Sequence, residues 1–382
     1  MNSAADAYRQ PPRRVTRVAG LMLMIFLVYG LASTFLAMAK GLKLVPTGLN
    51  IPAVLDGSVM RSISDRLSQT PVPTIAATTE RTGAWLLTRD LGRQVSRGCG
   101  NWLFLTEELQ PPLQAARFMQ QRVKTALQLR EALEKRGIAL LVLMVPDKSR
   151  IEEAQLCRLT RSRTLSGRLQ DWITALRAGG VQVVDSTPAL AALAAGALQP
   201  FYRTDTHWNE TGAQAAARSV AEAVRESGMQ PTPRRDYETT LLGPHVRPGD
   251  LVHLAGLDVL WPSLQPQPEW TATSSVVERP AGAGSATADL FGDSELATVA
   301  LIGTSFSRNS NFAPFLSRSL QTPVANFSRD GGNFLGSAQA YFKSAEFIEN
   351  PPKLVIWEIP ERTLQLQAEA DVSISFQTQQ KR

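Results

Sequence analysis

The stretch that decides the fold is Leu296-Ala297-Thr298-Val299-Ala300-Leu301-Ile302-Gly303-Thr304-Ser305-Phe306-Ser307. Its first part, through Ile302, is an apolar run that predicts a strand buried on both faces of a parallel sheet. A helical pattern follows at residues 311–320, so we expect Ser305 in the strand-to-helix turn. A hydroxyl in that turn lies at the carboxyl edge of the sheet, where ligands of open parallel sheets bind.

Strand and helix patterns alternate through the rest of the body, which predicts the α/β class with a parallel sheet. The expected strands lie at residues 138–145, 181–184, 323–327 and 353–359, and the expected helices at 114–135, 163–177, 188–195, 209–225 and 334–348. A short apolar strand at 99–105 is expected to cover a sheet edge. Prolines, glycines and polar residues interrupt the alternation at about 229–295, which we interpret as an irregular insertion or a lid.

A candidate general base lies in Arg203-Thr204-Asp205-Thr206-His207-Trp208-Asn209. The chain has only three histidines, and this one follows an aspartate by two residues. An aspartate that accepts the imidazole Nδ1 proton fixes the tautomer and leaves Nε2 free to take a proton from a nucleophile. Asp205, His207 and Ser305 are therefore the candidate catalytic residues for acyl transfer.

Competing explanations of these residues stay open. An Asp-x-His pair by itself is more often structural, or half of a metal site, than catalytic. His245 and His253 lie in the irregular insertion and nothing near them has ligand spacing, so we expect no metal and no other cofactor. Asp250, in Gly249-Asp250-Leu251, is explained by the capping of a helix.

The N-terminal region predicts one membrane-spanning helix. Residues 18–39 carry no charged side chain, and a helix of that length spans a bilayer core of roughly 30 Å. Arginines cluster before it, so the positive-inside rule predicts a cytoplasmic tail at 1–17 and a body outside the cytoplasm, which in a bacterium is the periplasm. The competing explanation is a signal peptide cleaved after Ala37-Met38-Ala39, but the apolar region of a cleaved peptide is usually only about 7–15 residues long.

Composition limits the remaining classes. The chain has 382 residues, 43% of them hydrophobic and 19% charged, which fits one catalytic-sized globular domain with appendages. The formal charge of +6 is partly due to the arginines of the N-terminal tail. The body therefore lacks the strong positive charge that is typical of nucleic-acid-binding domains. The two cysteines, Cys99 and Cys157, either pair as a disulfide in an oxidising compartment or are separate buried thiols.

Four motifs together resemble the AlgJ/AlgX family of alginate O-acetylation proteins. They are Gly100-Asn101-Trp102-Leu103-Phe104, Asp205-Thr206-His207-Trp208, Gly303-Thr304-Ser305-Phe306-Ser307 and Val355-Ile356-Trp357-Glu358-Ile359-Pro360-Glu361-Arg362. The resemblance covers residues 99–362 and implies an SGNH-hydrolase-like three-layer sandwich whose Ser, His and Asp acetylate a bacterial exopolysaccharide. The anchor favours the AlgJ-like branch, since AlgX-like members are soluble and carry a carbohydrate-binding module, which we do not expect after Arg362.

The order of the catalytic residues differs from that of ordinary SGNH hydrolases, in which the serine comes first and an Asp-x-x-His sequence last. The resemblance implies a circularly permuted order, and triads are defined by geometry rather than by chain order. Gly292-Asp293-Ser294 spells the usual nucleophile motif of that superfamily, but no strand leads into Ser294. We therefore assign the nucleophile to Ser305.

Six further residues are candidates for oxyanion or substrate contacts: Gly331, Gly332, Asn333, Arg203, Trp208 and Arg308. Backbone N–H groups of Ser305 or its neighbour and of the glycines, or the asparagine amide, can bind the tetrahedral oxyanion. A plain turn explains the glycines equally well. The arginines and the tryptophan either line a sugar cleft or pack inside the domain.

The resemblance also implies partners. No acetyl-CoA exists outside the inner membrane, so a multi-pass membrane O-acyltransferase is expected to donate the acetyl group, alongside other polysaccharide acetylation and secretion proteins. The acceptor is left open between alginate, cellulose and another exopolysaccharide. An acetylesterase with the same triad and a non-catalytic polysaccharide-binding or assembly protein remain alternatives. The expected organisation is a lead-in at 40–98, an acetyltransferase domain at 99–364 and a polar tail at 365–382.

The topology gives a first prediction. An alkaline phosphatase fused after residue 382 should be active in cells, because the positive-inside rule places the body outside the cytoplasm. N-terminal sequencing of the membrane fraction should not begin at Lys40, and a sequence that does begin there would identify a cleaved signal peptide.

Overall fold

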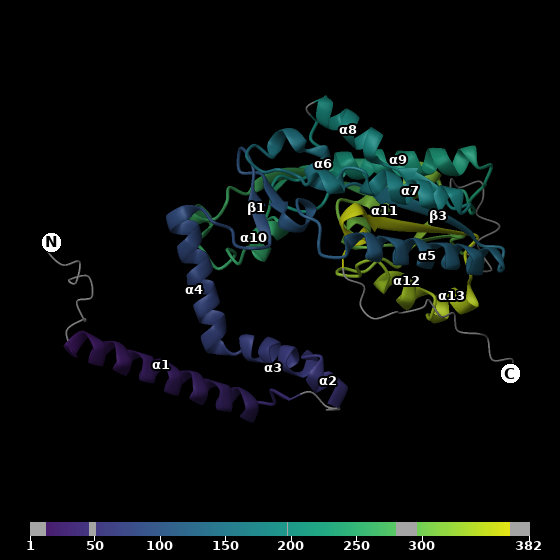
Figure 1. Cartoon of the computed structure of the whole chain (residues 1–382). Coiled ribbons are helices and arrows are strands. Elements are labelled where there is room, and N and C mark those ends of the chain that lie inside the picture. Colours follow the sequence, from purple (N-terminus) through teal and green to yellow (C-terminus); the bar gives the residue numbers. More distant parts are fainter. Residues whose placement is uncertain (1–12, 46–50, 197, 280–295, 367–382) are drawn as a thin grey trace, which may run out of the picture. The chain divides into compact units, whose positions relative to one another are not determined.

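The computed structural model describes residues 13–45, 51–196, 198–279 and 296–366 (Figure 1). The chain divides into two compact units, Met1–Asp90 and Leu91–Arg382. Most of the predicted cytoplasmic tail, most of the predicted polar tail and the end of the insertion lie outside the described residues. The same holds for Gly292-Asp293-Ser294.

The described part of the first unit is helical. Its helices are α1 (Arg13–Ala39), α2 (Ile51–Leu55), α3 (Ser58–Ser68) and α4 (Pro71–Thr88). Residues Arg17–Ala39 have a mean hydropathy of 2.2, and 6% of their apolar window is buried. By length and composition this segment can cross a bilayer, and its exposed apolar side chains form a surface that water solvates poorly.

A five-stranded parallel sheet forms the centre of the second unit. Its order is β4-β3-β9-β7-β8, with β4 at Gln182–Asp185, β3 at Ala139–Val145, β9 at Leu354–Pro360, β7 at Val299–Ile302 and β8 at Val324–Asn326. Every neighbouring pair is parallel, which confirms the predicted sheet. β9 pairs with both β3 and β7, and all its residues are buried.

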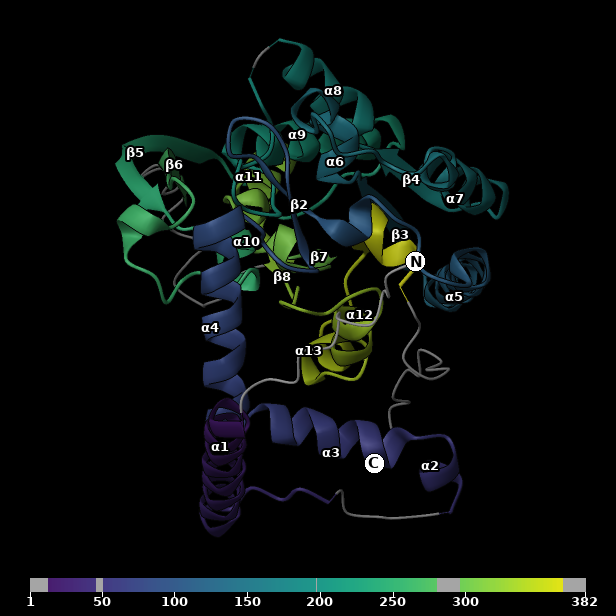
Figure 2. The same ribbon diagram turned by 60° about the vertical axis from the view of Figure 1, so that its left-hand side comes forward.

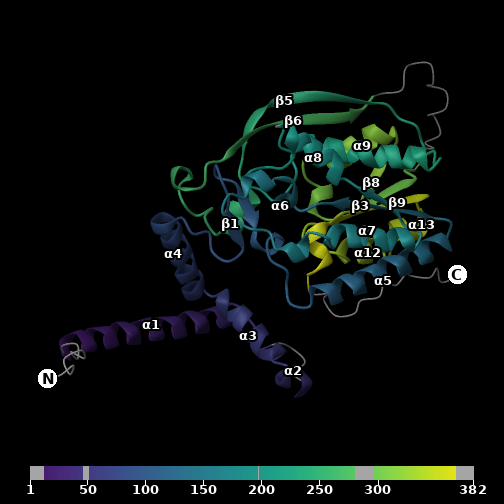
Figure 3. The ribbon, with the colours of Figure 1, turned by 45° about the horizontal axis from the view of Figure 1, so that its top comes forward.

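Helices cover both faces of this sheet, so the three-layer sandwich is confirmed (Figure 3). One face packs against α8 (Thr187–Ala195), α9 (Glu210–Glu226) and α11 (Phe312–Leu320). The other packs against α5 (Ala115–Glu134), α7 (Arg168–Ala178), α12 (Gly336–Tyr341) and α13 (Ala345–Glu349). Successive residues of β3 point to opposite faces, so Leu141 and Leu143 join the first core and Leu140 and Val142 the second.

Two elements differ from expectation. The helix expected at 334–348 is interrupted, because the Ser344 side chain accepts a hydrogen bond from the Phe347 N–H and starts α13 afresh. The expected edge strand at 99–105 is the shorter β2 (Leu103–Leu105), which pairs antiparallel with β1 (Val95–Arg97) in a sheet of its own. The second unit therefore begins at Leu91, before the predicted lead-in ends.

The insertion expected to be irregular contains regular structure where it is described. β5 (Tyr237–Arg247) and β6 (Glu269–Glu278) pair as a long antiparallel ribbon, with α10 (Asp250–Leu254) between them in the chain (Figure 2). Nearly all of β5 is exposed, so its sequence lacks the alternation that predicts a strand. Ser274 of β6 is buried against α9, where its backbone N–H and hydroxyl both donate to the Glu210 carboxylate.

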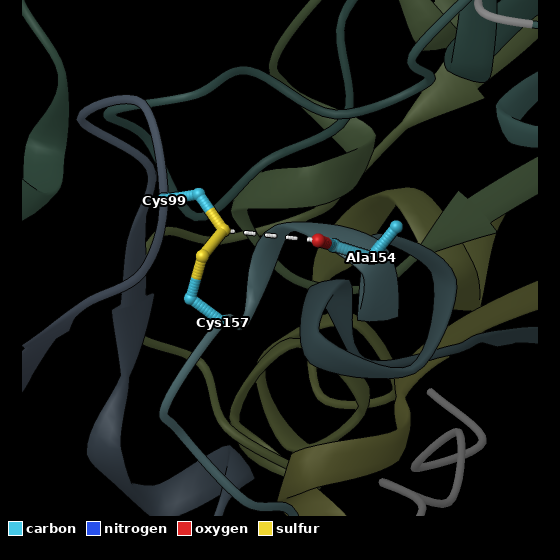
Figure 4. Close-up of a disulfide and its surroundings, with 3 residues drawn as sticks. All are labelled: Cys99, Ala154 and Cys157. Atoms are coloured by element: carbon cyan, nitrogen blue, oxygen red, sulfur yellow. Dashed lines mark hydrogen bonds between the residues drawn. A yellow bond between two sulfur atoms is a disulfide. The ribbon is translucent and has the colours of Figure 1, made fainter.

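A disulfide joins Cys99 to Cys157, across 58 residues of sequence (Figure 4). The Cys99 backbone N–H also donates to the Gln155 carbonyl at 2.9 Å. The disulfide therefore links the segment before β2 to the one that follows α6 (Lys148–Ile151). This arrangement fixes the hairpin of β1 and β2 beside the end of β3, from which α6 continues.

A buried cluster of charged side chains lies at the carboxyl ends of β3 and β9. The Glu361 carboxylate accepts hydrogen bonds from Arg150 at 2.6 Å and Arg161 at 2.7 Å, and Asp147 pairs with Arg161 and Arg168. Burial opposes ionisation of Glu361, but the three arginines outweigh it and hold its pKa at about 2. Burial and the charge of Glu361 raise the pKa of Asp147 to about 7.

Glu361 should therefore contribute strongly to stability. Glu361→Ala removes the carboxylate that Arg150 binds and leaves the buried Arg161 and Arg168 to share the Asp147 carboxylate, so we expect the free energy of unfolding to fall by about 3–5 kcal/mol at neutral pH. Because the folded pKa is depressed, this contribution is present above pH 4.5 and is lost as the pH falls toward 2.

Urea unfolding followed by tryptophan fluorescence measures this change. Glu131→Ala is the control, since that exposed glutamate forms only a solvent-screened i,i+4 pair with Lys135, which contributes little to stability. Equal losses in the two variants would contradict the assignment.

Candidate active site

The turn after β7 and the loop before α9 meet at the carboxyl edge of the sheet. Ser305 begins a short 3₁₀ turn directly after β7, as its strand-to-helix position predicts. The His207 loop ends at Asn209, whose side chain caps α9 by accepting hydrogen bonds from two backbone N–H groups. Ser305 Oγ lies 2.7 Å from His207 Nε2, and His207 Nδ1 lies 2.7 Å from Asp205 Oδ1. The structure thus brings the three predicted catalytic side chains together.

The imidazole is held in one orientation. Asp205 is an obligate acceptor when ionised, so His207 Nδ1 carries the proton and Nε2 accepts from the Ser305 hydroxyl. His207 is 6% exposed and its ring lies 4.9 Å from that of Phe306, centroid to centroid. A buried imidazole with its acceptor lone pair on the serine is arranged to act as a general base.

Asp205 is held in its ionised form. Burial opposes the charge, but hydrogen bonds from His207 and the nearby charges of His207 and Arg247 outweigh it, so the pKa of Asp205 lies well below its usual range. Oδ1 accepts from both the backbone N–H and Nδ1 of His207. Oδ2 accepts from Arg247.

A second carboxylate lies beside the histidine. Asp250 accepts from the Thr206 backbone N–H at 2.7 Å and from its hydroxyl at 2.5 Å, and its Oδ2 lies 3.5 Å from His207 Nδ1. Burial and the charge of Asp205 raise the pKa of Asp250. Asp250 begins α10, but its carboxylate binds the catalytic loop, so the expected helix cap is not its role. A Cβ at Gly249 would meet the Thr204 carbonyl oxygen, which explains the glycine there.

The nucleophile's turn rests on a carboxylate inside the central strand. Glu358 of β9 is 1% exposed and accepts from the Thr304 backbone N–H at 2.7 Å and the Ser307 hydroxyl at 3.0 Å. These two residues flank Ser305, so Glu358 fixes the turn from both sides. A Cβ at Gly303 would lie 2.5 Å from Glu358 Oε2, so only glycine fits there. Burial raises the pKa of Glu358.

Lys148 supports the loop that carries the base. Its buried ammonium donates to the backbone carbonyls of Leu103 at 2.6 Å, Arg203 at 2.9 Å and Asp205 at 3.0 Å. Burial lowers the pKa of Lys148 to about 8, although nearby carboxylates including Glu108 oppose the change.

The weaker sequence assignments have mixed outcomes. Trp208 is fully buried and packs against Phe306 and Phe312, so it belongs to the core rather than to a sugar cleft. Arg203 donates from Nη2 to the Gln267 carbonyl at 2.8 Å and so ties its loop to the residues before β6. The Arg308 side chain is 54% exposed and lies 3.3 Å from Asp330.

Some of the N–H groups that were candidate oxyanion donors already donate hydrogen bonds within the protein. The Gly332 N–H donates to the Arg329 carbonyl within its own turn, and the Phe306 N–H donates to the Thr304 hydroxyl. Gly331 has a φ of 66°, which a turn requires, and Asn333 is exposed. Among the described residues the Ser305 backbone N–H meets no acceptor, so it remains a candidate donor beside the predicted Gly331 N–H.

A cavity of about 770 Å³ lies next to the nucleophile's turn. Arg308, Arg329 and Tyr341 line it together with Gly331 and Gly332. One lining residue is hydrogen-bonded to that turn: the Arg329 backbone N–H donates to the Gly303 carbonyl at 3.1 Å.

Asp205, His207 and Asp250 also bring possible metal-ligand atoms within 4.8 Å of one another. The sequence did not suggest this set, because the third ligand comes from the insertion. Asp205 Oδ1 and His207 Nδ1 bind each other directly, and the remaining Asp205 oxygen accepts from Arg247. These contacts favour a catalytic triad over a metal site. A chelator distinguishes the two, because it would inactivate only a metal-dependent enzyme.

The fold and the Ser-His-Asp geometry define an SGNH-hydrolase-like domain. The family model described as "SGNH hydrolase-like domain, acetyltransferase AlgX" matches residues 95–361, and the chain belongs to this acetyltransferase family. The resemblance found in the sequence motifs is thereby confirmed.

Named relatives agree with this assignment. The probable alginate O-acetylase AlgJ of Azotobacter vinelandii is 33% identical over 273 residues, covering 70% of this chain and 69% of the relative. The AlgJ of Pseudomonas aeruginosa is 30% identical over 277 residues with the same coverage. The solved O-acetyltransferase domain of Pseudomonas putida AlgJ is 28% identical, with a TM-score of 0.63 over 72% of this chain and 94% of that domain.

Asp205 gives a prediction for the site. Asp205→Asn should keep the fold yet lower kcat for p-nitrophenyl acetate by about 10⁴-fold, because an amide favours the wrong imidazole tautomer. Asp250→Asn should cost much less, since Asp250 lies farther from Nδ1. A larger loss for Asp250→Asn, or EDTA-sensitive activity restored by zinc, would overturn the triad in favour of a metal site.

Proposed function

We propose that this chain transfers acetyl groups through an acetyl-Ser305 intermediate to hydroxyls of a bacterial exopolysaccharide. The observation that carries the proposal is the unbroken contact from Ser305 Oγ through His207 to Asp205, with 2.7 Å at each step. Relatives named as probable alginate O-acetylases support a polyuronate acceptor, with cellulose or another exopolysaccharide as the alternative.

Acetylation of the enzyme is the first half-reaction. Ser305 Oγ attacks the acetyl carbonyl carbon of the donor while its proton passes to His207 Nε2. Asp205 stabilises the resulting imidazolium through Nδ1, and the Ser305 backbone N–H is placed to bind the oxyanion, a contact typically worth about 3 kcal/mol. The bond from the carbonyl to the donor then breaks, and His207 returns the proton to the leaving group.

Transfer to the sugar reverses these roles. A sugar hydroxyl gives its proton to His207 Nε2 as its oxygen attacks the acetyl-serine carbonyl. The tetrahedral intermediate then collapses, the ester bond to Ser305 breaks, and the proton returns to Ser305 Oγ. If water attacks instead, the same side chains perform ester hydrolysis, so the acceptor decides between transferase and esterase.

The apolar α1 supports a membrane-anchored enzyme. In this proposal residues 1–17 lie in the cytoplasm, 18–39 cross the inner membrane, and 40–90 connect them to a periplasmic catalytic domain that begins at Leu91 rather than at the predicted residue 99. The acetyl group must then be passed across the membrane, for which we propose a multi-pass O-acyltransferase as donor. Other proteins of polysaccharide acetylation and secretion would complete the assembly.

Ser305→Ala tests the proposal. It should abolish consumption of p-nitrophenyl acetate and transfer of acetyl to an oligomannuronate, because the acyl-enzyme of this mechanism forms on the Ser305 hydroxyl. Mass spectrometry of the oligosaccharide, with cello-oligosaccharide in parallel, identifies the acceptor.

Ser294→Ala is the matched control and should leave both activities unchanged, since the sequence before that serine carries no strand pattern. Transfer that survives Ser305→Ala would refute the mechanism. Hydrolysis without any acetylated sugar would favour the esterase.

A further inference from the structure

Arg247 reaches into the site from the insertion. It is the last residue of β5, and its guanidinium lies over the Tyr202 ring at 4.4 Å from the centroid. Nε and Nη2 donate to Asp205 Oδ2 at 3.2 and 3.0 Å, and Nη2 also lies 3.3 Å from Asn309 Oδ1. The side chain is 22% exposed, so water screens these contacts only in part.

The two oxygens of Asp205 bind different partners. Oδ1 takes both donors of His207, and Oδ2 takes the two donors of Arg247 together with a longer contact, at 3.5 Å, from the Asp250 backbone N–H. A carboxylate bound through one oxygen alone can turn about its Cβ–Cγ bond, whereas contacts at both oxygens fix its plane. The plane of Asp205 sets the direction of His207 Nε2, and Nε2 must point at the serine.

Arg247 also touches the nucleophile's side of the site. Asn309 accepts from Arg247 through Oδ1 and donates through Nδ2 to the Ser305 carbonyl at 3.0 Å. The Asn309 backbone N–H donates to the same carbonyl at 2.9 Å. One guanidinium therefore contacts both the loop that carries the base and the turn that carries the nucleophile.

The opposite strand of the ribbon holds the same loop. Glu269 pairs with Arg247 across the ribbon, and its carboxylate accepts from the backbone N–H groups of Arg203 at 2.7 Å and Thr204 at 2.6 Å. The base of the ribbon thus binds the catalytic loop from both strands. A lid that opened here would have to break all of these contacts.

We propose that Arg247 is a positioning residue that holds Asp205 and the Ser305 turn in register, which makes the ribbon of β5 and β6 an integral part of the active site. This inference rests on the proposed Ser305 mechanism. Arginine suits the role, because its planar fork makes two hydrogen bonds to one carboxylate and keeps its charge at any physiological pH.

The pH dependence of kcat/KM distinguishes a positioning role of Arg247 from a purely structural one. The charged groups around His207 are Asp205 on its own loop, Arg247 and Asp250 from the insertion, Lys148 from α6 and Glu269 from β6. Loss of the positive charge of Arg247 favours the imidazolium, so the acid limb of kcat/KM should shift to higher pH. Weaker folding alone would lower activity without moving that limb.

The experiment uses the full chain in detergent with p-nitrophenyl acetate. Arg247→Ala should lower kcat by about 100-fold with little change in KM, the size expected for misplacement of a reacting group by about 1 Å. The acid limb should move upward, and millimolar guanidinium chloride should restore part of the activity. Arg247→Lys keeps the charge, so its acid limb should stay near that of the wild type while kcat falls.

Arg279→Ala is the control, an exposed arginine just after β6 at the far end of the ribbon from Arg247. The inference is overturned if the folded Arg247→Ala variant keeps the wild-type kcat and pH profile. It is also overturned if the variant loses activity but its acid limb does not shift and guanidinium does not restore activity. If Arg247→Ala does not fold, an unchanged kcat in Arg247→Lys overturns it instead. Activity that persists in Ser305→Ala would refute the mechanism itself, so the two failures are distinguishable.

Discussion

Lys148 is a charged side chain with almost no contact with water, and its need for acceptors fixes the catalytic loop. An unpaired buried ammonium is costly, so its three protons must be bound inside the protein. They are bound by the carbonyls of Leu103, Arg203 and Asp205. The rings of Trp102 and Phe104 lie about 5 Å from the nitrogen and complete its surroundings. One buried charge after the end of β3 therefore joins β2 to the Asp205 loop.

The nucleophile is supported separately, by the sheet itself. Glu358 lies in β9, the strand that pairs with both β3 and β7, and its carboxylate binds Thr304 and Ser307 on either side of the serine. Base and nucleophile are 98 residues apart in the chain and rest on different buried ionisable groups. Their relative position therefore depends on contacts that cross from one support to the other, and Asn309 and Arg247 make such contacts.

The sequence predicted those parts of the structure that local patterns determine. The central strands β3, β7 and β9 are buried on both faces and so form apolar runs, which located them within a few residues. Ser305 was found because a strand-to-helix turn is a local feature, and His207 because histidines are rare in this chain. Arg247 gave no such signal, since it acts through side-chain contacts made only after the insertion folds onto the body. Asp250 was noticed in its Gly249-Asp250-Leu251 motif but was interpreted as a helix cap. The ribbon was missed because β5 is almost wholly exposed and so lacks an apolar alternation. Glu358 and Lys148 did leave a trace, as charged residues within or directly after apolar strands.

The permuted order of the proposed catalytic residues is compatible with these two separate supports. A triad requires three side chains at fixed distances and places no constraint on the order of the segments that carry them. In this chain the base precedes the nucleophile, and the insertion lies between them. The segment that links the two halves in sequence is thus the one that contacts both in space, through Arg247 at the end of β5. An insertion in this position is unsuited to be a detachable lid, because its movement would release the Asp205 carboxylate on which the histidine depends.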